Sequence, residues 1–198
     1  MAVIKVSQAL TTLAIGGLGF ASAANAADFS FRGNFPADDT VQFFNFTVNT
    51  GSDITLSSLS YAGGTQADGT VIPAGGFDPI LSLFDASTGA RIGQNDDDQS
   101  VPRRVGTDPV TGQTYDTFLQ TFVNPGQYTV AVSQFDNFAG ENLSDPFPNA
   151  GQRNFTATFG CSAGQFCDAT GDSRTNSWAF DILNVDLAAP QPVALNSL

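Results

Sequence analysis

Residues 95–98, which read Asn-Asp-Asp-Asp, are the part of this sequence best suited to binding a metal ion. Calcium takes about six to eight oxygen ligands, supplied by carboxylates, amides and carbonyls. Three consecutive acids also repel one another unless water or a cation neutralises them. We expect Asp96 and Asp98 to be direct ligands, with Asp136 reaching the ion from a second acidic loop. The full candidate calcium set is Asp78, Asn95, Asp96, Asp98 and Asp136.

A solvated acidic turn that binds no ion is the alternative interpretation of the same residues. The run is not an EF-hand, because no glycine stands at the turn position and no glutamate closes the loop. The sequence alone leaves both interpretations open.

Catalytic chemistry has less support in this sequence. Residues 160–164 read Gly-Cys-Ser-Ala-Gly, the letters of a nucleophile elbow, but the chain has no histidine to activate Ser162. Two of the aspartates could stand at the separation that glycoside hydrolysis needs, yet no feature singles out a pair. We therefore predict a non-catalytic protein. Tyr61, Trp178 and the phenylalanines could form a sugar-stacking platform, although core positions explain them better.

The elements that position the acidic run are short segments of alternating polar and apolar residues. Residues 80–84 and 90–94 form a predicted hairpin that ends at the run, and Pro125-Gly126 predicts a second hairpin through a type II turn. Phe43-Phe44 breaks the alternation and indicates either a bulge or a strand covered on both faces. The predicted strands are 28–32, 41–48, 54–61, 80–84, 90–94, 115–123, 127–135, 154–159 and 177–185.

These strands, joined by turns rich in glycine, proline and aspartate, predict a single all-β antiparallel sandwich of about eight to nine strands. No segment of helix length shows a 3.6-residue apolar period. We place the sandwich domain at residues 27–186 and a flexible C-terminal tail at residues 187–198.

Residues 1–26 have the form of a signal peptide, with Lys5, an apolar stretch and a small-x-small site at residues 24–26. Cleavage before Ala27 leaves six basic residues against 19 acidic ones, a charge of −13, and no membrane span in the mature chain. Such a surface repels nucleic acid and attracts cations. In an exported protein, Cys161 and Cys167 most simply form a disulfide over a short loop.

The order of several motifs resembles that of bacterial pre-peptidase C-terminal domains. The motifs are residues 76–79, 81–85, 95–97 and 125–132, together with Gly89. This resemblance implies a jelly-roll-like β-sandwich associated with calcium and found on secreted enzymes.

A tighter resemblance is to the DVUA type of exported bacterial proteins, which often carry a PEP-CTERM sorting tail. It rests on residues 60–65, 134–138 and 178–183 and on the cysteine loop. The chain departs from that pattern after residues 190–192, which read Pro-Gln-Pro, because no hydrophobic span and no terminal arginines follow. The family has no established activity, so the resemblance implies a fold more than a function.

Together these features predict a secreted, non-catalytic protein of the cell surface or extracellular matrix, stabilised by calcium. Its expected partners are extracellular polysaccharide or copies of itself. The alternative is a subunit of an extracellular fibre, in which the strand around residues 29–32 adds to a neighbouring sheet. A secreted hydrolase is the third prediction.

Overall fold

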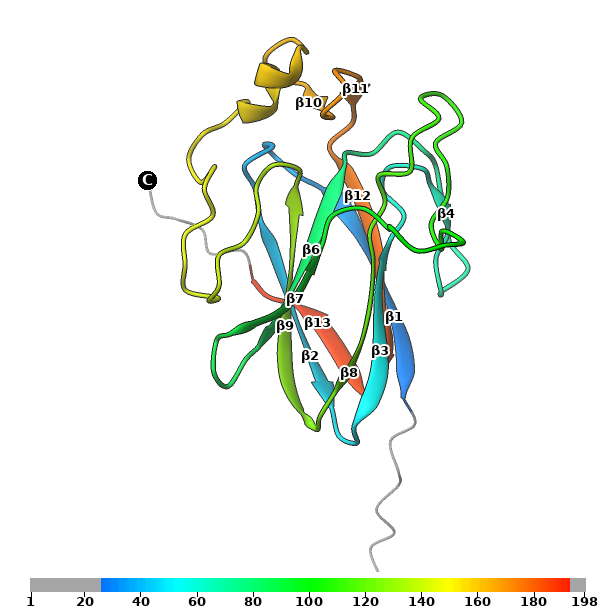
Figure 1. Cartoon of the computed structure of the whole chain (residues 1–198), viewed down its shortest axis with the longest axis vertical. Coiled ribbons are helices and arrows are strands. Elements are labelled where there is room, and N and C mark those ends of the chain that lie inside the picture. Colours follow the sequence, from blue (N-terminus) through cyan, green and yellow to red (C-terminus); the bar gives the residue numbers. More distant parts are fainter. Residues whose placement is uncertain (1–25, 193–198) are drawn as a thin grey trace, which may run out of the picture.

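The computed structural model describes residues 26–192 and shows two antiparallel β-sheets packed face to face (Figure 1). The strand order in the four-stranded sheet is β1 (Ala27–Asn34), β12 (Ser177–Val185), β3 (Ser52–Ser58) and β8 (Phe118–Val123). The order in the five-stranded sheet is β13 (Leu187–Pro190), β2 (Gln42–Val48), β9 (Gly126–Gln134), β6 (Pro79–Asp85) and β7 (Arg91–Asn95). The prediction of an all-β antiparallel sandwich is confirmed. The predicted signal peptide, up to residue 25, and residues 193–198 lie outside the described residues.

The core between the sheets is built largely from phenylalanine. Phe44 of β2 packs against Phe31 of β1 and Phe180 of β12, with ring centroids 4.7 and 4.8 Å apart. Phe43 packs edge-on against Phe147, a residue of the loop that covers the outer face of β2, at 6.1 Å. Because β2 pairs with β9 without a register shift, the strand covered on both faces is the correct interpretation and the bulge is not.

The two predicted hairpins have different outcomes. β6 and β7 do form a hairpin, with Leu81 opposite Asn95, so the acidic run follows directly from a buried strand pair. The hairpin at Pro125-Gly126 is wrong, because β8 and β9 belong to opposite sheets and Gly126 lacks the positive φ of a type II turn. Pairing β8 with β3, and β9 with β2 and β6, lets each strand turn its apolar residues toward the space between the sheets.

Residues 154–159, predicted as a strand, instead contain the 3₁₀-helix η1 (Phe155–Phe159). The buried carboxylate of Asp38 accepts hydrogen bonds from the backbone N–H groups of Asn154 and Thr156, at 2.7 and 2.9 Å. It also accepts the Thr156 hydroxyl at 2.8 Å. This distant carboxylate holds the first turn of the helix and overrides the alternating sequence pattern.

Residues 187–190 are not part of a flexible tail, which corrects the predicted domain boundary. They form β13, which pairs with β2 from Leu187 opposite Thr47 to Pro190 opposite Phe44. Ala188 is only 8 % exposed and joins the core. Pro190 is tolerated because β13 is an edge strand, where a missing N–H need not interrupt a ladder.

Two short ribbons complete the described structure. β4 (Gly64–Thr65) pairs with β5 (Val71–Ile72), and β10 (Phe166–Cys167) pairs with β11 (Ser173–Arg174). Cys161 and Cys167 are bonded, so the predicted disulfide is confirmed. Within residues 26–192, no helix has the length and apolar character needed to cross a bilayer.

Candidate metal centre

The predicted metal ligands gather at one end of the five-stranded sheet, where β6 begins and where β7 and β9 end. Asp78 immediately precedes β6, and Asn95 is the last residue of β7. The pairing of Pro79 with Gln134 brings the end of β9, and hence Asp136, to the same place. The antiparallel register of three neighbouring strands therefore collects acids that are distant in the sequence.

Three carboxylates form the centre of this cluster. Asp78, Asp96 and Asp97 each offer one oxygen, and these oxygens lie within 4.8 Å of one another. Asp78 is 3 % exposed, whereas Asp96 and Asp97 are partly exposed. The group therefore has one buried acid and two partly exposed ones.

Several oxygen atoms of the cluster are buried without a hydrogen-bond partner. The Oδ1 atoms of Asp78, Asp96 and Asp97 are in this state among the described residues, and so is Oδ1 of Asn95. A buried carboxylate oxygen without a donor is costly, because it has lost its water and gained nothing in return. Three carboxylate oxygens and one amide oxygen in this state at one sheet end favour a cation as their partner.

The electrostatics of the cluster give the same indication. Burial raises the pKa of Asp78 well above its ordinary value, and the charges of Asp96 and Asp97 raise it further. Burial raises the pKa of Asp96 to about 7, with contributions from Asp97 and Asp136. Burial also raises the pKa of Asp97, and the nearby Arg103 opposes this shift. The anionic form of each acid is thus held with too little compensating charge.

Asp98, predicted as a direct ligand, lies outside the group of three, and the structure places Asp97 in that group. The Asp98 carboxylate accepts hydrogen bonds from the backbone N–H groups of Ser100, at 2.9 Å, and Arg104. Burial would raise the pKa of Asp98, but these hydrogen bonds outweigh it and lower the pKa. Asp98 therefore stabilises the loop of residues 98–104, which follows the cluster.

The remaining two predicted ligands lie beside the three central acids. Asp136 is exposed and outside the group of three, although its charge contributes to the raised pKa of Asp96. Asn95 keeps a buried, unpartnered amide oxygen next to Asp96 in the chain, and is therefore a candidate neutral ligand.

Two polar residues immediately before β8, Asp116 and Thr117, hold the backbone near the cluster. The Thr117 hydroxyl lies within hydrogen-bonding distance of the Pro79 carbonyl, at 2.7 Å, and of the Asp96 carbonyl. Next to it, the buried Asp116 carboxylate accepts hydrogen bonds from the Ser58 hydroxyl and from the backbone of residues 60–62. Thr117 thus links the backbone next to Asp78 to that of Asp96, while Asp116 anchors the same segment to the end of β3.

The disulfide loop contacts residues next to the cluster. The Cys167 carbonyl accepts a hydrogen bond from Nε2 of Gln134, at 3.2 Å, and Gln134 is the last residue of β9. The Phe166 ring stacks on Phe77, with centroids 5.4 Å apart, and Phe77 immediately precedes Asp78. The loop therefore contacts Gln134, at the end of β9, and Phe77, which precedes Asp78.

This donor set fits a hard cation. It consists of carboxylate oxygens with a neighbouring amide oxygen, and the chain has no histidine to supply a nitrogen ligand. Oxygen donors without sulfur or nitrogen suit calcium or magnesium and are poor ligands for zinc. Calcium tolerates an irregular arrangement that leaves positions for water, whereas magnesium demands a nearly octahedral one.

Comparison with known proteins adds little to this geometry. No protein-family model and no curated protein matches the chain. One solved structure similar to it is the pre-peptidase C-terminal domain of a collagenase from Bacillus anthracis. The two share 10 % sequence identity over 82 % of this chain and 90 % of that one, with a TM-score of 0.38. A similarity this low carries no argument about function, and the sandwich assignment rests on the strand pairing described above.

Proposed function

We propose that this chain is an exported, non-catalytic module whose fold is stabilised by a calcium ion bound at Asp78, Asp96 and Asp97. The observation that carries the proposal is the buried Asp78 carboxylate, whose Oδ1 has no hydrogen-bond partner among the described residues. That carboxylate lies within 4.8 Å of two further carboxylate oxygens, and all three acids have a raised pKa. A divalent cation would remove the repulsion and supply the missing partner.

Thermal unfolding in calcium and in chelator tests this proposal. An ion that binds only the folded state adds about 1.4–2.7 kcal/mol when its free concentration is about 10–100 times its dissociation constant. For a domain of this size we expect calcium to raise Tm by about 5 °C. Magnesium at the same concentration should give less than half of that shift. A Tm that does not respond to calcium, or responds equally to magnesium, would remove the proposal.

A place at the cell surface or in the extracellular matrix follows from the predicted signal peptide and from the charge. The chain carries a formal net charge of −12. It has no histidine, the usual general base of nucleophilic catalysis, which supports the non-catalytic part of the proposal. Extracellular polysaccharide and further copies of the chain remain its proposed partners. Export is tested by the N-terminal sequence of the secreted protein, which we expect to begin at Ala27.

Two alternatives make different predictions. A fibre subunit would use β1, which lies at the edge of its sheet but already pairs with β12. Size-exclusion chromatography that shows only monomer would count against it. A hydrolase would use the raised pKa of Asp96, about 7, for a general acid. A hydrolytic activity that disappears in Asp96→Asn would favour the enzyme.

Opening the disulfide is expected to weaken calcium binding. The loop contacts Gln134 and Phe77. The double substitution Cys161→Ser/Cys167→Ser should therefore make the end of β9 and the start of β6 less well ordered. We expect the calcium dissociation constant to rise about tenfold, the size of effect seen when groups that orient a metal ligand are lost. Gln134→Leu, which removes the same hydrogen bond and keeps the disulfide, should give a similar loss. Unchanged affinity in both variants, measured on folded protein, would show that the loop does not support the site.

A further inference from the structure

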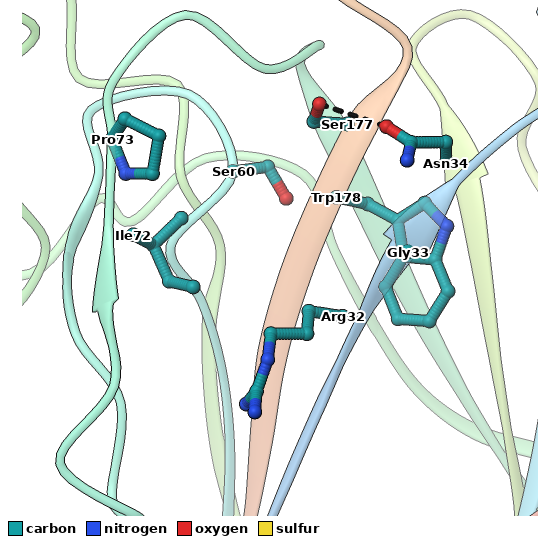
Figure 2. Close-up of a pocket in the computed structure, with 8 residues that line it drawn as sticks. All are labelled: Arg32, Gly33, Asn34, Ser60, Ile72, Pro73, Ser177 and Trp178. Carbon is teal, nitrogen blue, oxygen red and sulfur yellow. Dashed lines mark hydrogen bonds between the residues drawn. The ribbon is translucent and has the colours of Figure 1, made fainter.

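A pocket of about 270 Å³ opens between the four-stranded sheet and the β4–β5 ribbon (Figure 2). Its walls come from the end of β1, the start of β12 and the ribbon. None of its residues belongs to the candidate metal centre, so it is a separate feature of the molecule.

The loop between β4 and β5 is hydrogen-bonded to the four-stranded sheet, and these bonds fix the shape of the pocket. Nε2 of Gln66 donates to the carbonyls of Phe31 and Phe180, at 3.1 and 3.2 Å. Nη1 of Arg32 donates to Oε1 of Gln66 at 3.0 Å and pairs with Asp68 at 2.8 Å. A ligand would therefore enter a site that is already formed and would lose little ordering entropy.

Trp178 lines the pocket from the sheet side, and its position depends on Gly33. A Cβ atom at residue 33 would lie 2.7 Å from Cζ2 of the indole, so a side chain there would displace the ring. Tyr61, which the sequence grouped with Trp178 in a predicted aromatic platform, is fully buried in the described structure. Trp178 is therefore the member of that pair that lines a cavity.

The lining combines apolar walls with planar polar groups. Ile72 and Pro73 of the ribbon provide apolar surface, and Arg32 and Asn34 add a guanidinium and an amide (Figure 2). The indole of Trp178 lies on the core side of Gly33, behind this lining. Among the described residues, Nε and Nη2 of Arg32 have no hydrogen-bond partner, so these donors are available to a ligand. Apolar C–H groups pack against such walls, while ring hydroxyls bond to guanidinium and amide groups.

Charge and size narrow the choice of ligand. Arg32 is already neutralised by Asp68, and the chain as a whole carries a formal net charge of −12, which repels anions. The volume lies below the range of about 300–1,000 Å³ that is usual for drug-sized ligands, so it suits one small ring.

From this geometry we propose that the pocket binds one neutral pyranose unit of a glycan. The proposal does not depend on calcium, because it uses a different sheet end and different residues. It gives the chain a specific carbohydrate contact in addition to the metal centre.

Trp178 offers a direct test, because it is the one tryptophan in the chain. Its fluorescence should change saturably when the folded protein is titrated with short neutral oligosaccharides of glucose, galactose, mannose or N-acetylglucosamine. For a site that holds one ring, we expect a dissociation constant of about 1–10 mM. Arg32→Ala, at an exposed position, should raise that constant about fivefold and leave the fold intact.

Arg91→Ala is the matched control, because it removes another ion pair, Arg91–Glu141 at 2.6 Å, from the other sheet. It should leave the titration unchanged, and so should chelation of calcium. No saturable change with any of these sugars would overturn the proposal. An equal effect of the two arginine variants, or binding of uronic acid oligosaccharides alone, would overturn it as well.

Discussion

In calcium-free buffer, Asp78→Asn is expected to melt at a higher temperature than the wild-type protein. The wild-type carboxyl is 3 % exposed, and burial raises its pKa well above the ordinary value. At neutral pH it must either hold an uncompensated charge or keep a proton against its intrinsic preference, and both cost free energy. The amide avoids that cost, so we expect a gain of about 2 kcal/mol, or roughly 4–8 °C in Tm.

The same substitution should abolish the response to calcium. The introduced amide would offer a neutral oxygen in place of a charged one, and we expect calcium affinity to fall about 100-fold. Asp39→Asn is the control, because it removes the same charge from a residue outside the metal group. A variant that is less stable than wild type in chelator, yet still stabilised by calcium, would show that Asp78 is not a ligand.

The second large effect is on the pH dependence of stability. The pKa of Asp96 rises from 3.8 to about 7 on folding, so the folded protein binds its proton more tightly than the unfolded chain does. Stability contributed by that proton is present at low pH and is lost as pH rises from about 4 to about 7. One such group changes stability by about 1.4 kcal/mol per pH unit in this window. Because Asp96 is partly exposed, we expect a smaller total loss, about 2 kcal/mol.

With calcium present, stability should rise with pH instead of falling, because the ion binds carboxylates and competes with protons. The difference in Tm between the calcium-bound and calcium-free protein is therefore expected to widen from pH 5 to pH 8, as measured by thermal unfolding of metal-stripped samples. Asp96→Asn should flatten the calcium-free slope. Calcium-free stability that stays constant or rises between pH 4 and pH 7 would contradict the assigned electrostatics.

Short alternating or apolar segments separated by turns were sufficient to predict the sandwich, because every strand turns at least one face toward the core. They could not predict which strands pair. The Pro125-Gly126 turn joins β8 and β9, but the apolar faces of those strands are satisfied only when they enter opposite sheets. Residues 155–159 alternate as a strand does, yet the carboxylate of Asp38, 116 or more positions away, makes them helical. Both errors come from contacts that local sequence does not contain.

The calcium site remains a prediction, but some of its residues are gathered by the fold as the sequence suggested. Asp78 and Asp96 belong to the group of three, and the β6–β7 hairpin that positions them was visible in the sequence. Asp98 was predicted as a direct ligand and Asp97 was not, yet Asp97 belongs to the group of three and Asp98 does not. The chain bends at residues 96 and 97, and Asp98 turns to the backbone of the next loop. A run of Asp residues, which favours turns, was the one signal of this bend.

Calorimetric titration of calcium into the metal-stripped protein tests the central claim most directly. We expect one ion per chain, with a dissociation constant of about 10⁻⁴–10⁻³ M, the range of extracellular calcium modules. The double variant Asp96→Asn/Asp97→Asn should show no binding heat, while Asp39→Asn/Asp172→Asn, with the same loss of charge, should bind as wild type does. No binding by the wild-type protein, or equal binding by both double variants, would contradict the assignment of this site.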